Sequence, residues 1–325
     1  MLFATLAVAL VLITGLVAWY LPYRRDIRAA YQRLEELESR LVETPCGAVE
    51  YAERGDGQPL LLIHGNGGGF DQGLALGADL LGEAYRGIAP SRFGYLRSPL
   101  PDSADQPMQA DAFACLLDEL GVDRAVVIAW SAGGMSAAQL ALRHPERVAG
   151  LVLVSTGIAP SDAEQDVWLP PAAALRTVFG SDFIYWLSTK AFRSLTQRMF
   201  VPRGYQLDAA DEAVVADAFR TTLPIAPRAQ GAVFDTLETI TEPEREPSRY
   251  PLETLTVPTL VVTAEDDPSV RHDQVLTMVD RIPDAQLLSI PTGGHLMLGH
   301  RGIVTDSIRA FIEDAVRDEQ PMVTH

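Results

Sequence analysis

Three polar residues with the chemistry of a nucleophile, an acid and a base each follow a short apolar run. These residues are Ser131, Asp267 and His295. A histidine can take the proton of a serine hydroxyl, and a carboxylate can orient the imidazole and stabilise its cation. The set therefore predicts nucleophilic catalysis with Ser131 as nucleophile, Asp267 as acid and His295 as base. The neighbouring Asp266 is the alternative acid.

Small residues flank Ser131 in the sequence AWSAGG, which begins at Ala129. A sharp turn from a strand into a helix needs small residues because the backbone is crowded there. The hydroxyl would then stand at a helix N-terminus, where partial positive charge favours a developing anion. A serine that only caps the N-terminus of a helix would look the same, so this pattern is weak when taken alone.

A glycine-rich stretch follows another apolar run and reads HGNGGG at residues 64–69. Its backbone N–H groups would lie at the carboxyl edge of a parallel sheet, where such sheets bind ligands. We predict that the amides of Asn66 and Ala132 form an oxyanion hole. A phosphate-binding loop is the alternative, but the stretch has neither the G-x-G-x-x-G nor the GK[ST] pattern.

Together these motifs resemble those of the α/β-hydrolase superfamily, over about residues 47–318. HGNGGG resembles the family's HG-x-G loop, AWSAGG its G-x-S-x-G elbow, TAEDDPSV its acid turn and PTGGH its closing histidine motif. The resemblance implies an α/β fold with a mostly parallel central sheet, helices on both faces and a helical cap. Ala129 and Ala264 stand where the family has glycine, and the D-P-S-V register favours Asp267 over Asp266 as the acid.

Three further residues are assigned to substrate binding: Gly65, Trp130 and Arg92. Trp130 either lines an acyl pocket or packs in the core. Arg92 lies where the family often has D-x-R-G-x-G, and it either orders the loops beside the site or lies on the surface.

Short β-rich runs alternate with helical stretches from residue 47 onward, which indicates a mostly parallel sheet covered on both faces. The runs predicted to be strands are 47–53, 59–64, 85–90, 124–130, 148–155, 259–264 and 285–290. The predicted division is a transmembrane anchor at 1–22, a juxtamembrane helix and linker at 23–45, a core at 46–155 and 251–318, a helical cap at 156–250, and a tail at 319–325. The cap is assigned because an insertion this long normally forms a separate lid.

An uncharged apolar run at residues 2–21 precedes the predicted domain. At about 1.5 Å per residue, twenty helical residues span roughly the 30 Å of a bilayer core. A cleaved signal peptide is the alternative, but it would need a basic segment before a shorter apolar run. We expect a single-pass membrane protein with the lipid bilayer as partner. Because Arg24, Arg25 and Arg28 follow the run, the catalytic domain is predicted to be cytoplasmic.

Composition narrows the classes of function. A formal net charge of −17 excludes a nucleic-acid binder held by phosphate neutralisation. Cys46 and Cys115 cannot build a disulfide scaffold and lack the spacing of zinc or redox sites, and Cys115 is expected to be inert core. The sequence has no carboxylate–histidine cluster with metal spacing, so neither a metal nor a cofactor is expected.

The motifs favour hydrolysis of a small-molecule carboxylic ester through an acyl-Ser131 intermediate. The aromatic side chains of the predicted cap either form the cap's own core or line an acyl pocket. In the second case they favour an apolar acyl group. The same triad could cleave a carbon–carbon bond, as in the similar meta-cleavage-product hydrolases, although these usually have a polar residue where Trp130 stands. Dehalogenase or epoxide chemistry would need aspartate in place of Ser131. A catalytically idle ligand receptor is a further alternative.

Overall fold

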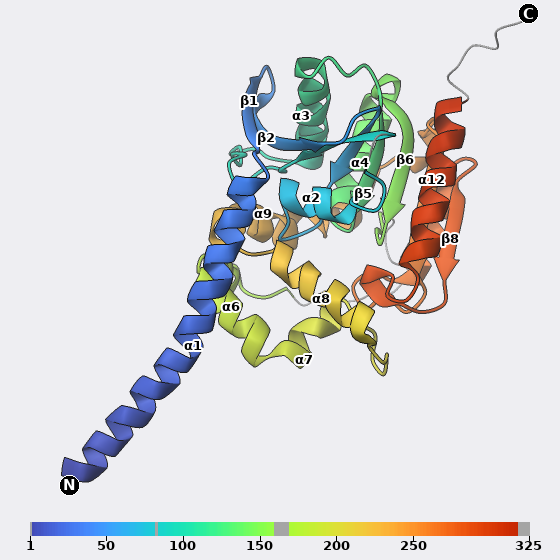
Figure 1. Ribbon diagram of the computed structural model, residues 1–325. Helices are drawn as coiled ribbons and strands as arrows, with labels where there is room; N and C mark the ends of the chain where they lie inside the picture. Colours follow the sequence, from blue (N-terminus) through green and yellow to red (C-terminus); the bar gives the residue numbers. More distant parts are fainter. Residues whose placement is uncertain (1, 82–83, 159–168, 318–325) are drawn as a thin grey trace, which may run out of the picture.

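The computed structural model describes residues 2–81, 84–158 and 169–317, and the side chains before Val17 lie outside this description. Its centre is an eight-stranded sheet in the order β1-β2-β4-β3-β5-β6-β7-β8 (Figure 1). The pairs β1–β2 and β2–β4 are antiparallel and the remaining pairs are parallel, which confirms the predicted mostly parallel sheet. The strands are β1 (Arg40–Thr44), β2 (Gly47–Arg54), β3 (Gln58–Ile63), β4 (Tyr85–Pro90), β5 (Ala125–Trp130), β6 (Val148–Val154), β7 (Thr259–Ala264) and β8 (Gln286–Ile290).

Strand side chains alternate between two apolar layers, one on each face of the sheet. On β3, Leu61 and Ile63 belong to one layer, whereas Leu60 and Leu62 belong to the other. The first layer is completed by α3 (Gln106–Glu119), α4 (Gly133–Arg143) and α11 (His272–Arg281), and the second by α2 (Phe70–Leu76) and α12 (Arg301–Arg317). Because both faces are covered, β5 and β6 are apolar along their whole length.

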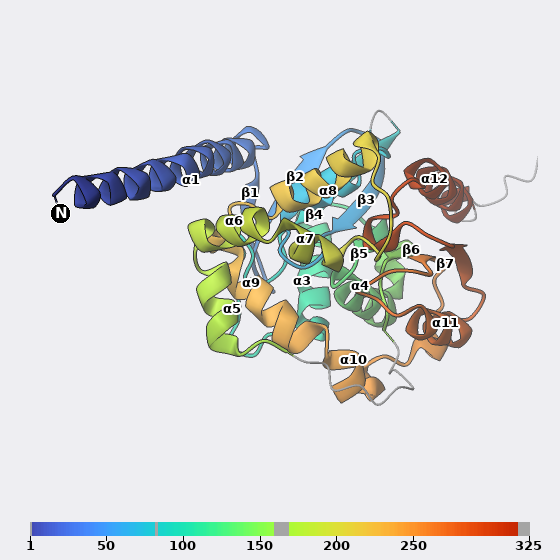
Figure 2. The ribbon, with the colours of Figure 1, turned by 90° about the horizontal axis from the view of Figure 1, so that it is seen from below.

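A helical segment lies between β6 and β7, and Figure 2 shows its helices in front of the sheet. Its helices are α5 (Ala172–Phe179), α6 (Asp182–Ala191), α7 (Arg193–Thr196), α8 (Ala209–Thr221), α9 (Ala229–Phe234) and α10 (Glu242–Arg245). Polar caps fix two of the helix starts, because Ser181 accepts from the Ile184 amide and Asp208 from the Asp211 amide. We refer to this segment as the cap; residues 159–168 of its predicted range lie outside the described residues.

The strand β1 corrects the predicted linker at 23–45. Its residues Arg40–Thr44 pair in register with β2 and extend the sheet by one strand. The sequence does not predict this strand, because RLVET is short and mostly exposed and carries little of the apolar pattern that marks a buried strand.

The first helix, α1 (Leu2–Glu36), includes the start of the segment predicted to be a juxtamembrane helix and linker. Its C-terminal half packs on α6: the ring of Trp186 lies 6.0 Å from that of Trp19 and 5.7 Å from that of Tyr23. The Trp186 indole N–H donates to Asp26 at 3.0 Å, and Ala30 is buried in the same contact. The N-terminal part of α1 projects away from the domain (Figure 1). The helix predicted beside the membrane is therefore partly covered by the cap, with Ile27 in the same apolar cluster as Trp186.

Among the described residues, no helix is long and apolar enough to cross a membrane. The predicted anchor falls mainly on residues 2–16, whose side chains lie outside the described part.

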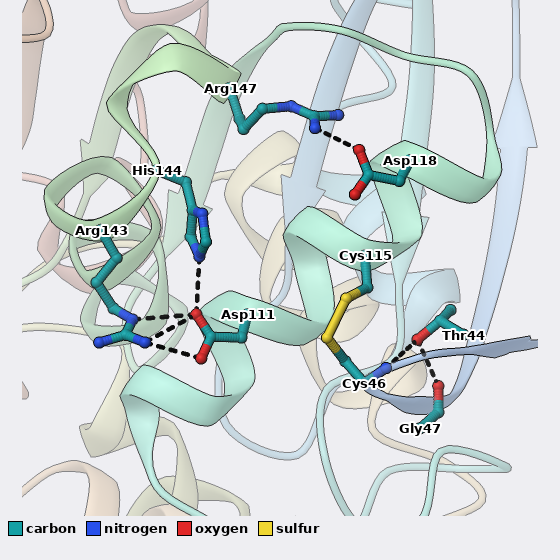
Figure 3. The surroundings of a disulfide bond; sticks show 9 residues. All are labelled: Thr44, Cys46, Gly47, Asp111, Cys115, Asp118, Arg143, His144 and Arg147. Carbon is teal, nitrogen blue, oxygen red and sulfur yellow. Dashed lines mark hydrogen bonds and ion pairs between the residues drawn. A yellow bond between two sulfur atoms is a disulfide. The ribbon is translucent and has the colours of Figure 1, made fainter.

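A disulfide joins Cys46, in the turn between β1 and β2, to Cys115 on α3 (Figure 3). This bond corrects the expectation that Cys115 is an inert core thiol. The two cysteines are 69 residues apart in the sequence, and only the pairing of β1 with β2 brings the turn over α3. Nearby, Asp111 accepts from both Arg143 and His144, so α3 and α4 are also tied together.

Candidate active site

Ser131 lies in the sharp turn between β5 and α4, with φ at +50°. Its N–H donates to Val154 O at 2.9 Å, and its carbonyl accepts from Gly134 N and from the Thr156 hydroxyl, both at 2.9 Å. A non-glycine residue in this left-handed region costs energy, and such strain persists only where the surroundings impose it. These backbone hydrogen bonds impose it here, and none of them uses the Ser131 hydroxyl.

Close backbone approach explains the small residues around this turn. A Cβ added at Gly133 would lie 2.5 Å from His64 O, and one added at Gly134 would lie 2.2 Å from a Thr156 methyl. The N-terminus of α4 can therefore pack against the HGNGGG loop, at Gly133, and against the segment after β6, at Gly134, only if these positions have no side chain.

His295 and Asp267 lie together at the same edge of the sheet. The His295 Nδ1 is 2.9 Å from Asp267 Oδ2 and 3.1 Å from Oδ1, and the Asp267 side chain is fully buried. Asp267 Oδ1 also accepts from the amides of Ser269 and Val270 at 2.8 and 3.1 Å. Because a carboxylate can only accept, Nδ1 carries the ring proton and Nε2 is left with a free lone pair. That tautomer is the one a general base needs.

Asp266 has a different partner from Asp267. Its Oδ1 accepts from the Gly294 amide at 2.9 Å, which fixes the turn one residue before His295. Of the two aspartates that the sequence left open, the one in contact with the imidazole is Asp267.

The amides of Asn66 and Ala132 are available for a ligand. Within the described part of the chain, neither N–H donates a hydrogen bond to another residue, and both residues line the same cavity as Ser131 and His295. The Asn66 side chain is held by Tyr95, whose hydroxyl donates to Asn66 Oδ1 at 3.2 Å, and by Thr236, which accepts from Nδ2 at 3.1 Å. These contacts fix the residue whose amide is the predicted oxyanion donor.

The cavity has a volume of about 750 Å³ and lies between the sheet edge and the cap. This volume is within the usual range for sites that bind small molecules. Its lining is mostly apolar on the cap side, with Val178, Phe179, Met199, Phe200, Phe219 and Ile225.

The comparison with known proteins agrees with this architecture. Residues 58–299, most of the chain, match the protein-family model described as "alpha/beta hydrolase fold". The chain belongs to this family.

Proteins similar to this hydrolase are named for different activities. It is 29% identical to 2-hydroxymuconate semialdehyde hydrolase of Pseudomonas putida over 75% of this chain and 82% of that protein. An esterase from Thermogutta terrifontis has a similar structure, with a TM-score of 0.64 and 24% identity over 86% of this chain and 99% of that one. A bacterial membrane phospholipase A is similar in fold over 96% of this chain and 98% of that one, with a TM-score of 0.63 and 23% identity.

Arg92 of this hydrolase is not among the described residues that line the cavity, which corrects its assignment to substrate binding and agrees with the alternative that it orders the loops beside the site. Its side chain is buried, with Nη1 donating to Asp235 Oδ1 at 2.8 Å and Nε to His64 O at 3.1 Å. Asp235 belongs to the cap, in the π-helix Asp235–Thr239. Arg92 therefore joins the cap to the HGNGGG loop, and its charge is neutralised there.

His64 is not a second base. Its Nε2 accepts from the Arg92 N–H at 3.0 Å, so the ring proton is on Nδ1, which donates to Gly65 O at 2.7 Å. Burial, assisted by the positive charge of Arg92, holds the pKa of His64 well below its usual value. The ring is therefore neutral at physiological pH.

The other residues predicted to bind substrate line the cavity, and one of them also packs in the core. Gly65 lines the cavity, and Trp130 both lines it and packs in the second apolar layer. The cap aromatics have the same two roles. Phe179 and Tyr185 line the cavity, whereas Phe183 packs on α1 with Trp186.

Two hydroxyl residues that the sequence motifs do not predict also hold the site together. Ser155 donates to His295 O, and Thr156 to Ser131 O, each at 2.9 Å. Both come directly after β6, so their position at a strand's carboxyl end was an available signal. The cap residue Phe200 accepts from the His295 N–H at 3.0 Å, and nothing in the sequence indicated this contact.

Proposed function

We propose that this hydrolase cleaves a carboxylic ester through an acyl-Ser131 intermediate. The observation that carries the proposal is the contact between His295 Nδ1 and Asp267, on a cavity that Ser131 also lines. His295 Nε2 takes the hydroxyl proton as Ser131 Oγ attacks the ester carbonyl, and Asp267 stabilises the imidazolium. The amides of Asn66 and Ala132 donate to the oxyanion, and each such donor is worth roughly 3–4 kcal/mol.

The second half of the reaction uses the same groups. His295 returns its proton to the departing alkoxide, and the alcohol leaves. Water then loses a proton to His295 and attacks the acyl carbon, which releases the carboxylic acid and restores the Ser131 hydroxyl. No other reactant is required.

Cleavage of a carbon–carbon bond is the second candidate, favoured by the similarity to 2-hydroxymuconate semialdehyde hydrolase. A dienoate substrate has a carboxylate that needs a cationic partner. Among the described residues that line the cavity, the arginines are Arg271 and Arg301, and each is ion-paired with an aspartate. The apolar lining supports an ester with an uncharged acyl chain.

A substrate panel distinguishes the candidates. We expect turnover of p-nitrophenyl esters, with kcat/KM at least about tenfold higher for octanoate than for acetate. Burial of only two of the additional CH₂ groups, at roughly 0.8 kcal/mol each, already gives a factor of about ten. A ring-fission dienoate should be cleaved more slowly than the best ester. The reverse order would favour carbon–carbon chemistry, and no turnover of either class would favour an idle receptor.

We further propose that residues 2–21 hold the enzyme on a lipid bilayer. Support comes from their uncharged sequence and from the exposed Trp19 and Tyr20 where α1 leaves the domain. The cap turn beside α6 also presents apolar side chains to solvent, with Phe192 and Leu195 each 60% exposed. Figure 1 shows α6 and α7 on the side from which the N-terminal part of α1 projects.

The orientation in that membrane stays a prediction, and two observations disagree on it. Arg24, Arg25 and Arg28 predict a cytoplasmic domain. The disulfide between Cys46 and Cys115 is typical of oxidising compartments and favours the opposite side.

Alkylation of the cysteines in cells decides between the two sides. We expect Cys46 and Cys115 to react with maleimide only after denaturation and reduction, with Cys46→Ser, which leaves one free thiol, as the control for labelling. Full alkylation of the denatured protein without reductant would place the domain in a reducing compartment, as the arginines predict.

A further inference from the structure

One arginine of α1 reaches from the first helix to the helix that follows the HGNGGG loop. Arg33 is largely buried, with a side chain only 16% exposed. Its Nη2 and Nε lie 3.0 and 3.3 Å from Asp71 Oδ2, and Nη2 also donates to Leu223 O in the cap. Asp71 lies in the first turn of α2, two residues after the last glycine of the loop.

A second arginine binds the same carboxylate from the cap. The guanidinium of Arg228 faces Asp71 with two parallel contacts, Nη1 to Oδ1 at 2.8 Å and Nη2 to Oδ2 at 2.9 Å. Both side chains are completely buried. Nη1 also donates to Gly68 O at 2.6 Å, so the same group holds the loop backbone. Asp71 therefore links α1, the cap and the HGNGGG loop.

The charges of this cluster are unequal, since two guanidinium groups share one carboxylate. Burial lowers the pKa of Arg33, the positive charge of Arg228 acts in the same direction, and Asp71 opposes both. Buried ion pairs are a poor source of stability, because the cost of removing charge from water often exceeds the attraction. Their better-attested use is to specify one arrangement of the parts they join.

The HGNGGG loop, which this cluster holds, contains the predicted oxyanion donor Asn66. Asn66 lies in the loop whose end is held by Asp71 and Arg228, and a Cβ added at Gly69 would lie 2.7 Å from Arg228 Nη1. The loop therefore has little room to move unless the cluster moves with it. Oxyanion donors act only when they are held in place before the charge develops.

We propose that Arg33 is a positioning residue for the oxyanion loop, so that α1 contributes to catalysis in addition to its proposed role as a membrane anchor. The proposal rests on the proposed function, because it needs the Asn66 amide to stabilise an oxyanion. Arg33 does not touch the substrate and acts through Asp71. Its loss should therefore slow the chemical step and leave substrate binding nearly unchanged.

The test compares Arg33→Ala with Arg28→Ala in the full-length chain. Both changes remove one positive charge from α1, but Arg28 is exposed. For Arg33→Ala we expect kcat on p-nitrophenyl butyrate and the rate of fluorophosphonate labelling to fall roughly tenfold, a fraction of the loss caused by removing a whole oxyanion donor. KM should stay within about twofold of wild type, since ground-state binding does not use the oxyanion contacts. Arg28→Ala should match wild type.

Two further variants separate positioning from folding. Arg33→Lys keeps the charge with a single contact and should restore part of the labelling rate, whereas Arg33→Gln should behave like Arg33→Ala. If Arg33→Ala does not fold, Arg33→Gln takes its place. Wild-type labelling rates in the folded variants, or an equal loss in Arg28→Ala, would overturn the inference and leave the proposed function intact. If wild-type protein were not labelled at Ser131, the proposed function would fail and the inference with it.

Discussion

Replacement of Ser131 by alanine is expected to lower kcat for p-nitrophenyl esters by roughly 10⁶-fold, the loss found when the serine nucleophile of a triad is removed. KM should change little, and fluorophosphonate labelling should disappear. The fold should survive, because the turn is held by the Ser131 N–H and carbonyl and not by its hydroxyl. The cavity walls and the His295–Asp267 contact would also remain.

A matched control lies on the same helix. Ser136 is fully buried in α4, and its hydroxyl donates to the local carbonyl Gly133 O at 3.0 Å. Ser136→Ala should therefore keep a kcat close to that of wild type. If Ser131→Ala retained activity within about tenfold of wild type, a barrier difference of only 1.4 kcal/mol, an acyl-serine pathway would be excluded.

The parts of the site that could be predicted from the sequence are those that follow strands. Ser131, Asp267 and His295 each come at or shortly after the carboxyl end of a parallel strand, and the sheet brings these ends to one edge. Their local surroundings are also encoded nearby, as in the glycines that permit the approach of α4 to the HGNGGG loop. Position along the chain was therefore a good guide to position in space.

Contacts between distant elements could not be predicted in this way. The partner of Arg92 is Asp235, 143 residues further along, and that of Asp71 is Arg228, 157 residues further along. Each residue is an ordinary charged residue in its own segment, and only the docking of the cap buries it. The packing of Trp186 on α1 could not be predicted for the same reason. A sequence pattern shows that a helix has an apolar face but not which element covers that face.

The choice between Asp266 and Asp267 gives the second large expected effect. Asp267→Asn should lower kcat by roughly 10⁴-fold, as in serine proteases whose triad aspartate is changed to asparagine. Asp266→Asn should keep kcat near that of wild type, because an asparagine oxygen can still accept from the Gly294 amide.

The expected loss in Asp267→Asn follows from the donors around this side chain. The amides of Ser269 and Val270 both donate to Oδ1, so the asparagine oxygen stays there and its NH₂ group faces His295. An NH₂ group can only donate, and the imidazole must then accept at Nδ1 and carry its proton on Nε2. A protonated Nε2 cannot take the Ser131 proton. Fluorophosphonate labelling at several pH values measures this directly, and a larger loss in Asp266→Asn than in Asp267→Asn would show that the acid has been assigned to the wrong residue.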